Sequence, residues 1–348
     1  MSPEAPSDWT GECLAAAGLD AKASVPLRRR LRAAALGGLA GAAAHLPSAA
    51  VLPFLRAASS QARRGRLGER ARRNLELALG SELDSAAREQ LLQRCFAHGA
   101  RQASEWLRLA RGAAPESIQG AWIEHAVLFD DSIEHLEKIQ ADGRGAILVT
   151  AHLGNWELLA AAVRRRGVRG AVVGRVNRQQ RSSAWLPRLR AGYGVPTLPQ
   201  DSSPRGLLRV LQTGGVIGML CDLEVRRLDG EHLPFFGVPA LTMSAPAALA
   251  RAAKLPLLPV RCVLPVGAGP QDSYRLQFEE PIRAPARGSG EQGTRATLTQ
   301  LLAVYERWIR ESPEQWAWHQ HRWRTQPGSY EALPMAERRR IDIAKLKG

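Results

Sequence analysis

The residues best suited to chemistry lie in the segment TAHLGNWELL, residues 150–159. His152 follows an apolar run typical of a buried strand, and Glu157 belongs to the helical stretch that comes next, with Gly154 between them to permit a tight turn. A carboxylate that hydrogen-bonds an imidazole holds it in one tautomer and stabilises its protonated form, so the other ring nitrogen can take a proton from a hydroxyl. His152 and Glu157 are therefore a candidate general base and its orienting acid.

The spacing of these two residues limits how they can meet. Positions five apart on a continuous helix point about 140° away from each other, so His152 and Glu157 come together only if the strand–loop–helix junction folds back. A purely structural hydrogen-bonded pair is the alternative interpretation. A metal site is disfavoured because a third ligand is not obvious and the spacing is not HExxH. The sequence also lacks the GxSxG elbow of serine hydrolases.

The elements that must position this segment alternate between strand and helix from about residue 120 onward. Strand-like runs bounded by glycine or proline occupy residues 145–151, 170–176, 214–222, 255–264 and 274–282. Helical patterns occupy residues 157–167, 244–254 and 296–313. Such alternation predicts an α/β fold with a mixed, partly parallel central sheet flanked by helices. Ligands of open α/β sheets bind beyond the carboxyl ends of the strands, which is where His152 is expected.

The N-terminal part has a different character. After a group of arginines, 23 residues from Ala33 to Leu55 carry no formal charge, and as a helix they would reach about 34 Å, enough for a bilayer core. The segment is rich in Ala and Gly and contains Pro47 and Pro53, whereas spanning helices usually carry more Leu, Ile and Phe. A full span, an interfacial helix or hairpin, and an ordinary buried helical pair all remain open. We expect an N-terminal helical membrane-associating segment.

The charge of the chain points to an anionic partner. There are 48 Lys and Arg against 33 Asp and Glu, a formal net charge of +15, and residues 56–80 alone contain seven arginines. Arginine binds phosphate oxygens bidentately, so nucleic acid, an anionic membrane surface, an acidic carrier or a phosphorylated substrate would all fit. No helix-turn-helix, zinc-finger or RNA-recognition signature accompanies the charge, which disfavours nucleic acid.

Four regions follow from these patterns. They are a polar lead over residues 1–25, a basic helical membrane-associating region over 26–112, an α/β domain over 113–327 and a tail over 328–348. The polar, acidic start does not look like a cleavable signal peptide. The four scattered cysteines form no CxxC pair and favour reduced thiols in a cytosolic setting.

The chain resembles the lipid A biosynthesis acyltransferases, the late acyltransferases that add secondary acyl chains to lipid A precursors. The resemblance covers roughly residues 25–327 and runs through several blocks in order. These are the segment around Arg73 and Asn74, GRGAILVTAHLGNWE (143–157), GRVNR (174–178), LRAGYG (189–194), GGVIGMLCD (214–222), LPFFGVPALTMSAPAALA (233–250) and SPEQWAWHQHRWRT (312–325).

This resemblance implies acyl transfer from an acyl carrier protein thioester to a lipid hydroxyl. The histidine of the family's HxxxxE/D motif is the general base and the acid orients it, so these roles pass to His152 and Glu157. Substrate-binding roles pass to Arg175, Arg190 and Asp222, with Asn177 as a further candidate; surface positions are the alternative for the arginines. No metal or organic cofactor is expected, because a thioester is already activated.

Two departures from the family pattern bear on the acceptor. Asp222-Leu223 stands where members usually have Asp-Gln, and Gln320-His321-Arg322 stands where they usually have His-Arg-Arg after the second tryptophan. Phe235 and Phe236 fit either an acyl groove or core packing, with core as the default. The tryptophans of 312–325 fit either a membrane interface or closure of the domain, and we favour closure.

The function predicted from the sequence is transfer of a fatty acyl chain to a lipid A precursor or related glycolipid. The predicted place is the cytoplasmic face of the inner membrane, with acyl carrier protein, the glycolipid acceptor and the anionic membrane surface as partners. Another lipid acceptor, such as a phosphoglycolipid or an aminolipid, is the alternative. A catalytically silent basic membrane-binding relative is a second alternative.

Overall fold

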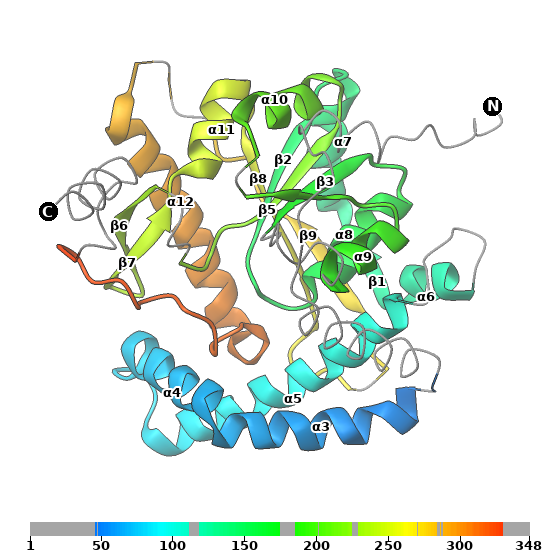
Figure 1. Ribbon diagram of the computed structural model, residues 1–348, viewed down its shortest axis with the longest axis vertical. Coiled ribbons are helices and arrows are strands. Elements are labelled where there is room, and N and C mark those ends of the chain that lie inside the picture. The colour runs from blue at the N-terminus through cyan, green and yellow to red at the C-terminus, as the bar shows by residue number, and fades with distance from the viewer. Residues whose placement is uncertain are drawn as a thin grey trace, which may run out of the picture.

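The computed structural model describes residues 46, 48–110, 118–174, 185–200, 202–224, 229–269, 271–283, 286 and 288–329. A seven-stranded sheet forms the centre of this part of the chain (Figure 1), in the order β1-β9-β8-β2-β5-β3-β4. The strands are β1 (Val127–Phe129), β2 (Ala146–Thr150), β3 (Gly170–Gly174), β4 (Thr197–Pro199), β5 (Val216–Leu220), β8 (Leu257–Val263) and β9 (Tyr274–Phe278).

Most of the strand pairs are parallel. β2 pairs in parallel with β5 and β8, and β3 pairs in parallel with β4 and β5. Only β9 runs antiparallel to its neighbour β8, and β1 then pairs in parallel with β9. The predicted α/β fold with a mixed, partly parallel sheet is therefore confirmed.

Helices cover both faces of the sheet because alternate residues of a strand point to opposite sides. In β2, Ile147 and Val149 belong to one buried cluster, and Ala146 and Leu148 belong to the other. The first cluster takes in α10 (Pro204–Gln212), α11 (Ala245–Ala253) and α12 (Gly290–Glu311). The second takes in α6 (Ile118–Ala126), α7 (Glu134–Ala141), α8 (Trp156–Arg165) and α9 (Trp185–Gly192). Every residue of β2 is buried, which explains why its first four residues, Ala146 to Val149, are all apolar.

Three helices lie together across one end of this core (Figure 1): α3 (Ser48–Arg64), α4 (Arg66–Leu79) and α5 (Ser85–Leu109). The side chain of Asp84 caps α5 by accepting the Ala87 backbone N–H. Residues 33–45 of the predicted membrane segment lie outside the described residues. In the described part of the chain, no helix combines the length and the apolar character that crossing a membrane requires. Membrane association of this region stays a prediction.

The aromatic residues singled out in the sequence are buried. Phe235 and Phe236 lie in the hairpin of β6 (Gly230–Phe235) and β7 (Val238–Met243), and both belong to the core. The tail tryptophans Trp316, Trp318 and Trp323 follow the short helix η3 (Pro313–Gln315) and are also buried. The tail therefore packs against the domain and closes it, as we favoured, and the phenylalanines pack in the core.

The turn between β2 and α8 depends on a glycine. Gly154 has a φ of +61°, and a Cβ atom built there would lie 2.0 Å from the carbonyl oxygen of Cys262 in β8. The backbone N–H of Asn155 donates to that same oxygen at 2.9 Å. The close approach of the turn to β8 thus leaves no room for a side chain.

We predict that Gly154→Ala destabilises the protein more than Gly143→Ala does. Gly143 has a similar φ of +67° but open space where a Cβ would lie. Its substitution therefore measures only the cost of holding alanine in a left-handed backbone conformation, about 1–2 kcal/mol of stability. Gly154→Ala adds the clash with Cys262, which should lower the free energy of unfolding by at least a further ~1–2 kcal/mol. Urea denaturation of both variants tests this, and equal losses would contradict it.

Candidate active site

Two parallel strands bring a histidine and an aspartate together at the edge of the sheet. Thr150 at the end of β2 is paired in register with Leu220 at the end of β5. Two positions beyond each of them, Nδ1 of His152 lies 2.8 Å from Oδ1 of Asp222, and the backbone N–H of His152 donates to Oδ2 at 2.9 Å. The register of the sheet therefore juxtaposes residues that are 70 positions apart in the chain.

Asp222 is completely buried and ionised. Burial by itself raises the pKa of its carboxyl. The attraction of the His152 ring when it is protonated, with hydrogen bonds from His152 and Trp316, outweighs that effect, so the net pKa lies below its ordinary value. The indole Nε1–H of Trp316 donates to Oδ2 at 2.7 Å. An ionised carboxylate can only accept hydrogen bonds, so Nδ1 of His152 carries a proton and Nε2 of the neutral ring is left as the basic nitrogen.

Glu157 is not the partner of His152, and the predicted hydrogen bond between them is wrong. Helix α8 begins at Trp156 and turns Glu157 into the buried layer beneath α9, where it has no exposed surface. Its carboxylate accepts from Nη2 of Arg190 at 2.5 Å, from Nε of Arg190 at 2.9 Å and from the hydroxyl of Tyr193 at 2.6 Å. The turn at Gly154 does not fold back far enough to reverse the outward angle that a spacing of five imposes.

The predicted substrate-binding residues differ in where they lie. Arg190 lines the pocket described below, but its guanidinium is committed to Glu157, whose charge raises the pKa of Arg190 in spite of the opposing effect of burial. Asp222 lies at the pocket through its contact with His152. Arg175 and Asn177 lie outside the described residues, so their roles stay predictions.

Helix α5 braces the turn that carries His152. The side-chain amide of Gln102 donates to the carbonyl oxygen of Gly154 at 2.5 Å. Asn155 caps α8 by accepting the Leu158 N–H at 3.1 Å, accepts from Trp106 Nε1 at 3.0 Å and donates to Glu105 at 2.7 Å. This helix lies within the helical region predicted over residues 26–112, but a local pattern cannot show that its polar residues reach a turn some fifty positions away.

The tail holds the same turn from another direction. The backbone N–H of Ala317 donates to the carbonyl oxygen of His152 at 3.0 Å, and that of Gly154 donates to Gln315 at 3.0 Å. Together with the bond from Trp316 to Asp222, these contacts fix both members of the pair. Sequence reasoning placed this tail as a closing element, and the structure adds that it supports the site.

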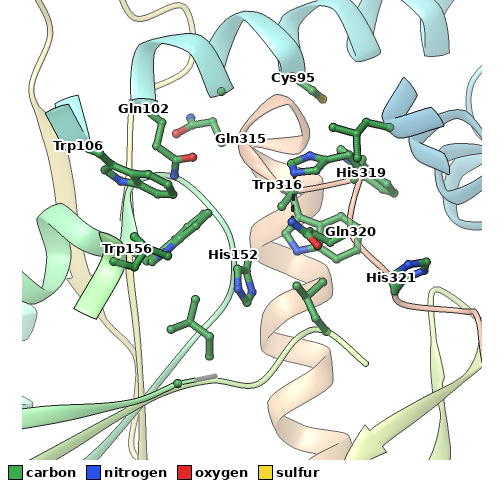
Figure 2. A pocket seen from close by; sticks show the side chains of 18 of the residues that line it. Cys95, Gln102, Trp106, His152, Trp156, Gln315, Trp316, His319, Gln320 and His321 are labelled. Atoms are coloured by element: carbon green, nitrogen blue, oxygen red, sulfur yellow. Dashed lines mark hydrogen bonds between the residues drawn. The ribbon is translucent and has the colours of Figure 1, made fainter. Parts of the chain in front are cut away.

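The His152 ring opens onto a large pocket. The pocket has a volume of about 1110 Å³, and the His152 side chain is 25% exposed in it. Figure 2 shows the His152 ring between two groups of side chains, with Trp106 and Trp156 on one side and His319, Gln320 and His321 on the other. The Trp156 ring packs edge-on against His152, with 4.9 Å between ring centroids. No grouping of three or more potential metal ligands occurs within the described ranges.

These features define a class of α/β enzyme in which an imidazole at the carboxyl edge of the sheet, oriented by a buried carboxylate, faces a substrate pocket. Residues 27–325 match the family model of the bacterial lipid A biosynthesis acyltransferases. The chain belongs to this family.

Two curated relatives share part of the sequence. Both are phosphatidylinositol mannoside acyltransferases of Mycobacterium tuberculosis, from strains CDC 1551 / Oshkosh and ATCC 25618 / H37Rv. Each is 28% identical to this chain over 135 residues, which is 37% of this chain and 42% of the relative. The match thus covers less than half the length of these relatives.

We predict that Glu157→Gln destabilises the fold, because it leaves the buried guanidinium of Arg190 without a counter-charge. Removing one partner of a buried ion pair typically loses about 3–5 kcal/mol. The double variant Glu157→Gln/Arg190→Met should regain part of that loss, since it removes the unpaired charge. Urea denaturation measures both. Full stability of Glu157→Gln combined with loss of activity would instead show a direct part for Glu157 in the chemistry.

Proposed function

We propose that His152 acts as the general base of an acyl transfer from a thioester to a lipid hydroxyl. Nε2 of His152 takes the proton of the hydroxyl while its oxygen attacks the thioester carbonyl carbon. The carbon–sulfur bond then breaks, and the imidazolium returns the proton to the departing thiolate. Asp222 orients the ring and stabilises the imidazolium. The observation that supports this is the pairing of His152 Nδ1 with a buried, ionised carboxylate beside an open pocket.

The acyl chain has an apolar place to bind on the Trp156 side of His152. The apolar residues Val173, Leu186, Met219 and Leu220 line the large pocket together with the two tryptophans. A second cavity of about 50 Å³ lies beneath α8, has an almost wholly apolar lining and shares Trp156, Met219 and Leu220 with the large pocket. An apolar wall with few polar groups is what a hydrocarbon chain requires.

The donor and acceptor in this proposal are an acyl carrier protein thioester and a lipid A precursor or related glycolipid. The names of the relatives support a sugar-bearing lipid, since they act on a mannoside. A phosphoglycolipid or aminolipid acceptor is the alternative. The reaction as proposed uses no metal or organic cofactor, because the thioester is already activated.

The outer surface of α3 and α4 suits contact with an anionic membrane, which we propose is the cytoplasmic face of the inner membrane. Phe54 is 78% exposed and Leu77 is 46% exposed on these helices. Arg56, Arg64 and Arg73 are exposed nearby, and none of the three has an ion-pair partner in the part of the chain that the structure describes. Other residues of α3 and α4 line the rim of the large pocket, so a lipid held at this surface would lie close to the entrance.

We predict that His152→Ala lowers kcat for acyl transfer by about 10²–10⁴-fold, the usual worth of a positioned base. Asp222→Asn should lower kcat by at least ~10²-fold, because an amide can present its NH₂ group to Nδ1 and no longer stabilises the imidazolium. Purified protein, acyl carrier protein loaded with chains of several lengths and a panel of lipid acceptors provide the assay.

The control for these variants is the conservative change Asp222→Glu, which keeps the charge but misplaces it, and which should retain more activity than Asp222→Asn at high pH. Thermal unfolding of each variant checks that the fold is intact. Transfer that persists at the wild-type rate in folded His152→Ala would exclude the mechanism. Absence of transfer from any thioester to any hydroxyl acceptor by the wild-type protein would exclude the function.

We predict that Arg56→Gln/Arg64→Gln weakens binding to anionic vesicles. Each basic residue near such a surface contributes about 1 kcal/mol, so the loss should be about 2 kcal/mol, roughly 30-fold in affinity. Co-sedimentation with phosphatidylglycerol-containing vesicles at low salt measures it. Phe54→Ser should also weaken binding, whereas the control Val266→Ser, at an 84% exposed apolar residue after β8, should not. Unchanged binding by the α3 variants would place the lipid contact elsewhere in the chain.

A further inference from the structure

The pocket has a polar end that the chemistry of the thioester does not explain. It is formed by residues 318–321, named here the tail loop, on the side of His152 away from Trp156 (Figure 2). His319, Gln320 and His321 of this loop all line the pocket. These are polar side chains placed beside the candidate base.

The backbone of the tail loop is held on both sides. The side-chain amide of Asn74 in α4 donates to the carbonyl oxygens of Trp318 and Gln320, each at 2.8 Å, and Asn74 is itself buried. Arg70, also in α4, donates to the carbonyl oxygen of His319 at 3.1 Å. From the sheet side, the backbone N–H of Glu224 donates to the carbonyl oxygen of His321 at 3.1 Å. The loop is therefore preorganised, which lowers the entropy lost when a ligand binds.

The charges that line the described pocket are balanced. Arg324 is paired with Glu224, at 2.8 Å, and the side chain of Glu224 is fully buried. Arg190 is paired with Glu157 at the other end. A phosphate group is best bound by guanidinium forks that are free to accept it, and both of these forks are already committed to carboxylates.

The remaining polar groups of the tail loop suit hydroxyls. Burial lowers the pKa of His319 to about 4, and the neighbouring His152 and Arg70 act in the same direction, so the His319 ring is neutral at pH 7. A neutral imidazole has one donor and one acceptor, and the Gln320 amide has both kinds of group. Nε2 of His319 lies 3.3 Å from the Gln320 amide nitrogen. This pair presents adjacent neutral groups to the pocket.

We propose that His319, Gln320 and His321 form the acceptor subsite, and that this subsite takes an uncharged carbohydrate ring and presents one of its hydroxyls to His152. The proposal rests on the function proposed above and deepens it by assigning the acceptor to one end of the pocket. The acyl chain then occupies the Trp156 end, and the two substrates meet at the imidazole. The same loop carries the departure Gln320-His321 from the family pattern, which makes it a place where acceptor choice can differ between members.

The first test uses two probes that share an alkyl chain and differ in the headgroup. Octyl mannoside and octyl phosphate are titrated calorimetrically into the full-length protein below their micellar concentrations. Wild-type protein should bind octyl mannoside at least ~10-fold more tightly than octyl phosphate. Gln320→Ala should reduce this preference to about 3-fold or less, because the alkyl chains are identical and only the headgroup contact changes. Stronger binding of octyl phosphate by wild-type protein would overturn the proposal.

The second test separates the subsite from the reaction. In the transfer assay, Gln320→Ala should raise the KM for a neutral glycolipid acceptor about 10-fold and leave the KM for the acyl donor unchanged. Gln320→Ala keeps the backbone carbonyl that Asn74 binds, so the loop should stay in place, and thermal unfolding checks this. Gln326→Ala, the same change further along the tail and outside the pocket lining, is the matched control and should behave as wild type.

The outcomes of the two tests distinguish this proposal from the function it rests on. If wild-type protein transfers acyl chains but Gln320→Ala alters the KM of the donor alone, the subsite is wrong and the function stands. If wild-type protein shows no transfer at all yet binds octyl mannoside through Gln320, the function is wrong and the sugar-binding site stands.

Discussion

The hydrogen bond between His152 and the buried carboxylate of Asp222 is the constraint on which the rest of the site depends. An ionised carboxylate without exposed surface is tolerated only when its oxygens are well bonded. Here the ring and the backbone N–H of His152 supply two donors, and the indole of Trp316 supplies a third. These three donors come from the end of β2 and from the tail, while the carboxylate follows β5. The full set of bonds can therefore form only when the ends of β2 and β5 and the tail have come together.

This dependence explains why so much of the protein converges on one short turn. Helix α5 binds the turn through Gln102 and the Asn155 cap, β8 accepts the Asn155 backbone N–H, and the tail binds His152 and Gly154. A base must be held to within a fraction of an ångström to be effective. The strand, helix and tail contacts supply that precision because each acts on the backbone or on a buried cap rather than on the exposed ring itself.

The sequence predicted the fold, the position of His152 and the closing tail, but not the partner of the base. Strand–helix alternation is a local pattern, and it placed His152 at a strand end correctly. The Asp222 partner depends on the register of β2 against β5, which local patterns do not contain. The family resemblance assigns Asp222 only a substrate-binding role. The sequence predicts Glu157 as the orienting acid, both from its closeness to His152 and from the family's HxxxxE/D motif. The start of α8 at Trp156 instead turns it towards Arg190, with which it forms a buried ion pair.

The distribution of charge then connects the site with its surroundings. The chain carries a net charge of +15, and exposed arginines of α3 and α4 contribute to it on the outside. In the described pocket lining, by contrast, Arg190 and Arg324 are neutralised by Glu157 and Glu224. A basic surface concentrates anionic lipid but selects poorly among headgroups, since it acts through long-range attraction. A charge-balanced interior selects by hydrogen bonds. A hydroxyl group that finds no hydrogen-bond partner there loses far more binding free energy than it would at the surface. In the reaction as proposed, gathering the lipid and choosing the hydroxyl would accordingly be separate tasks, performed by different parts of the protein.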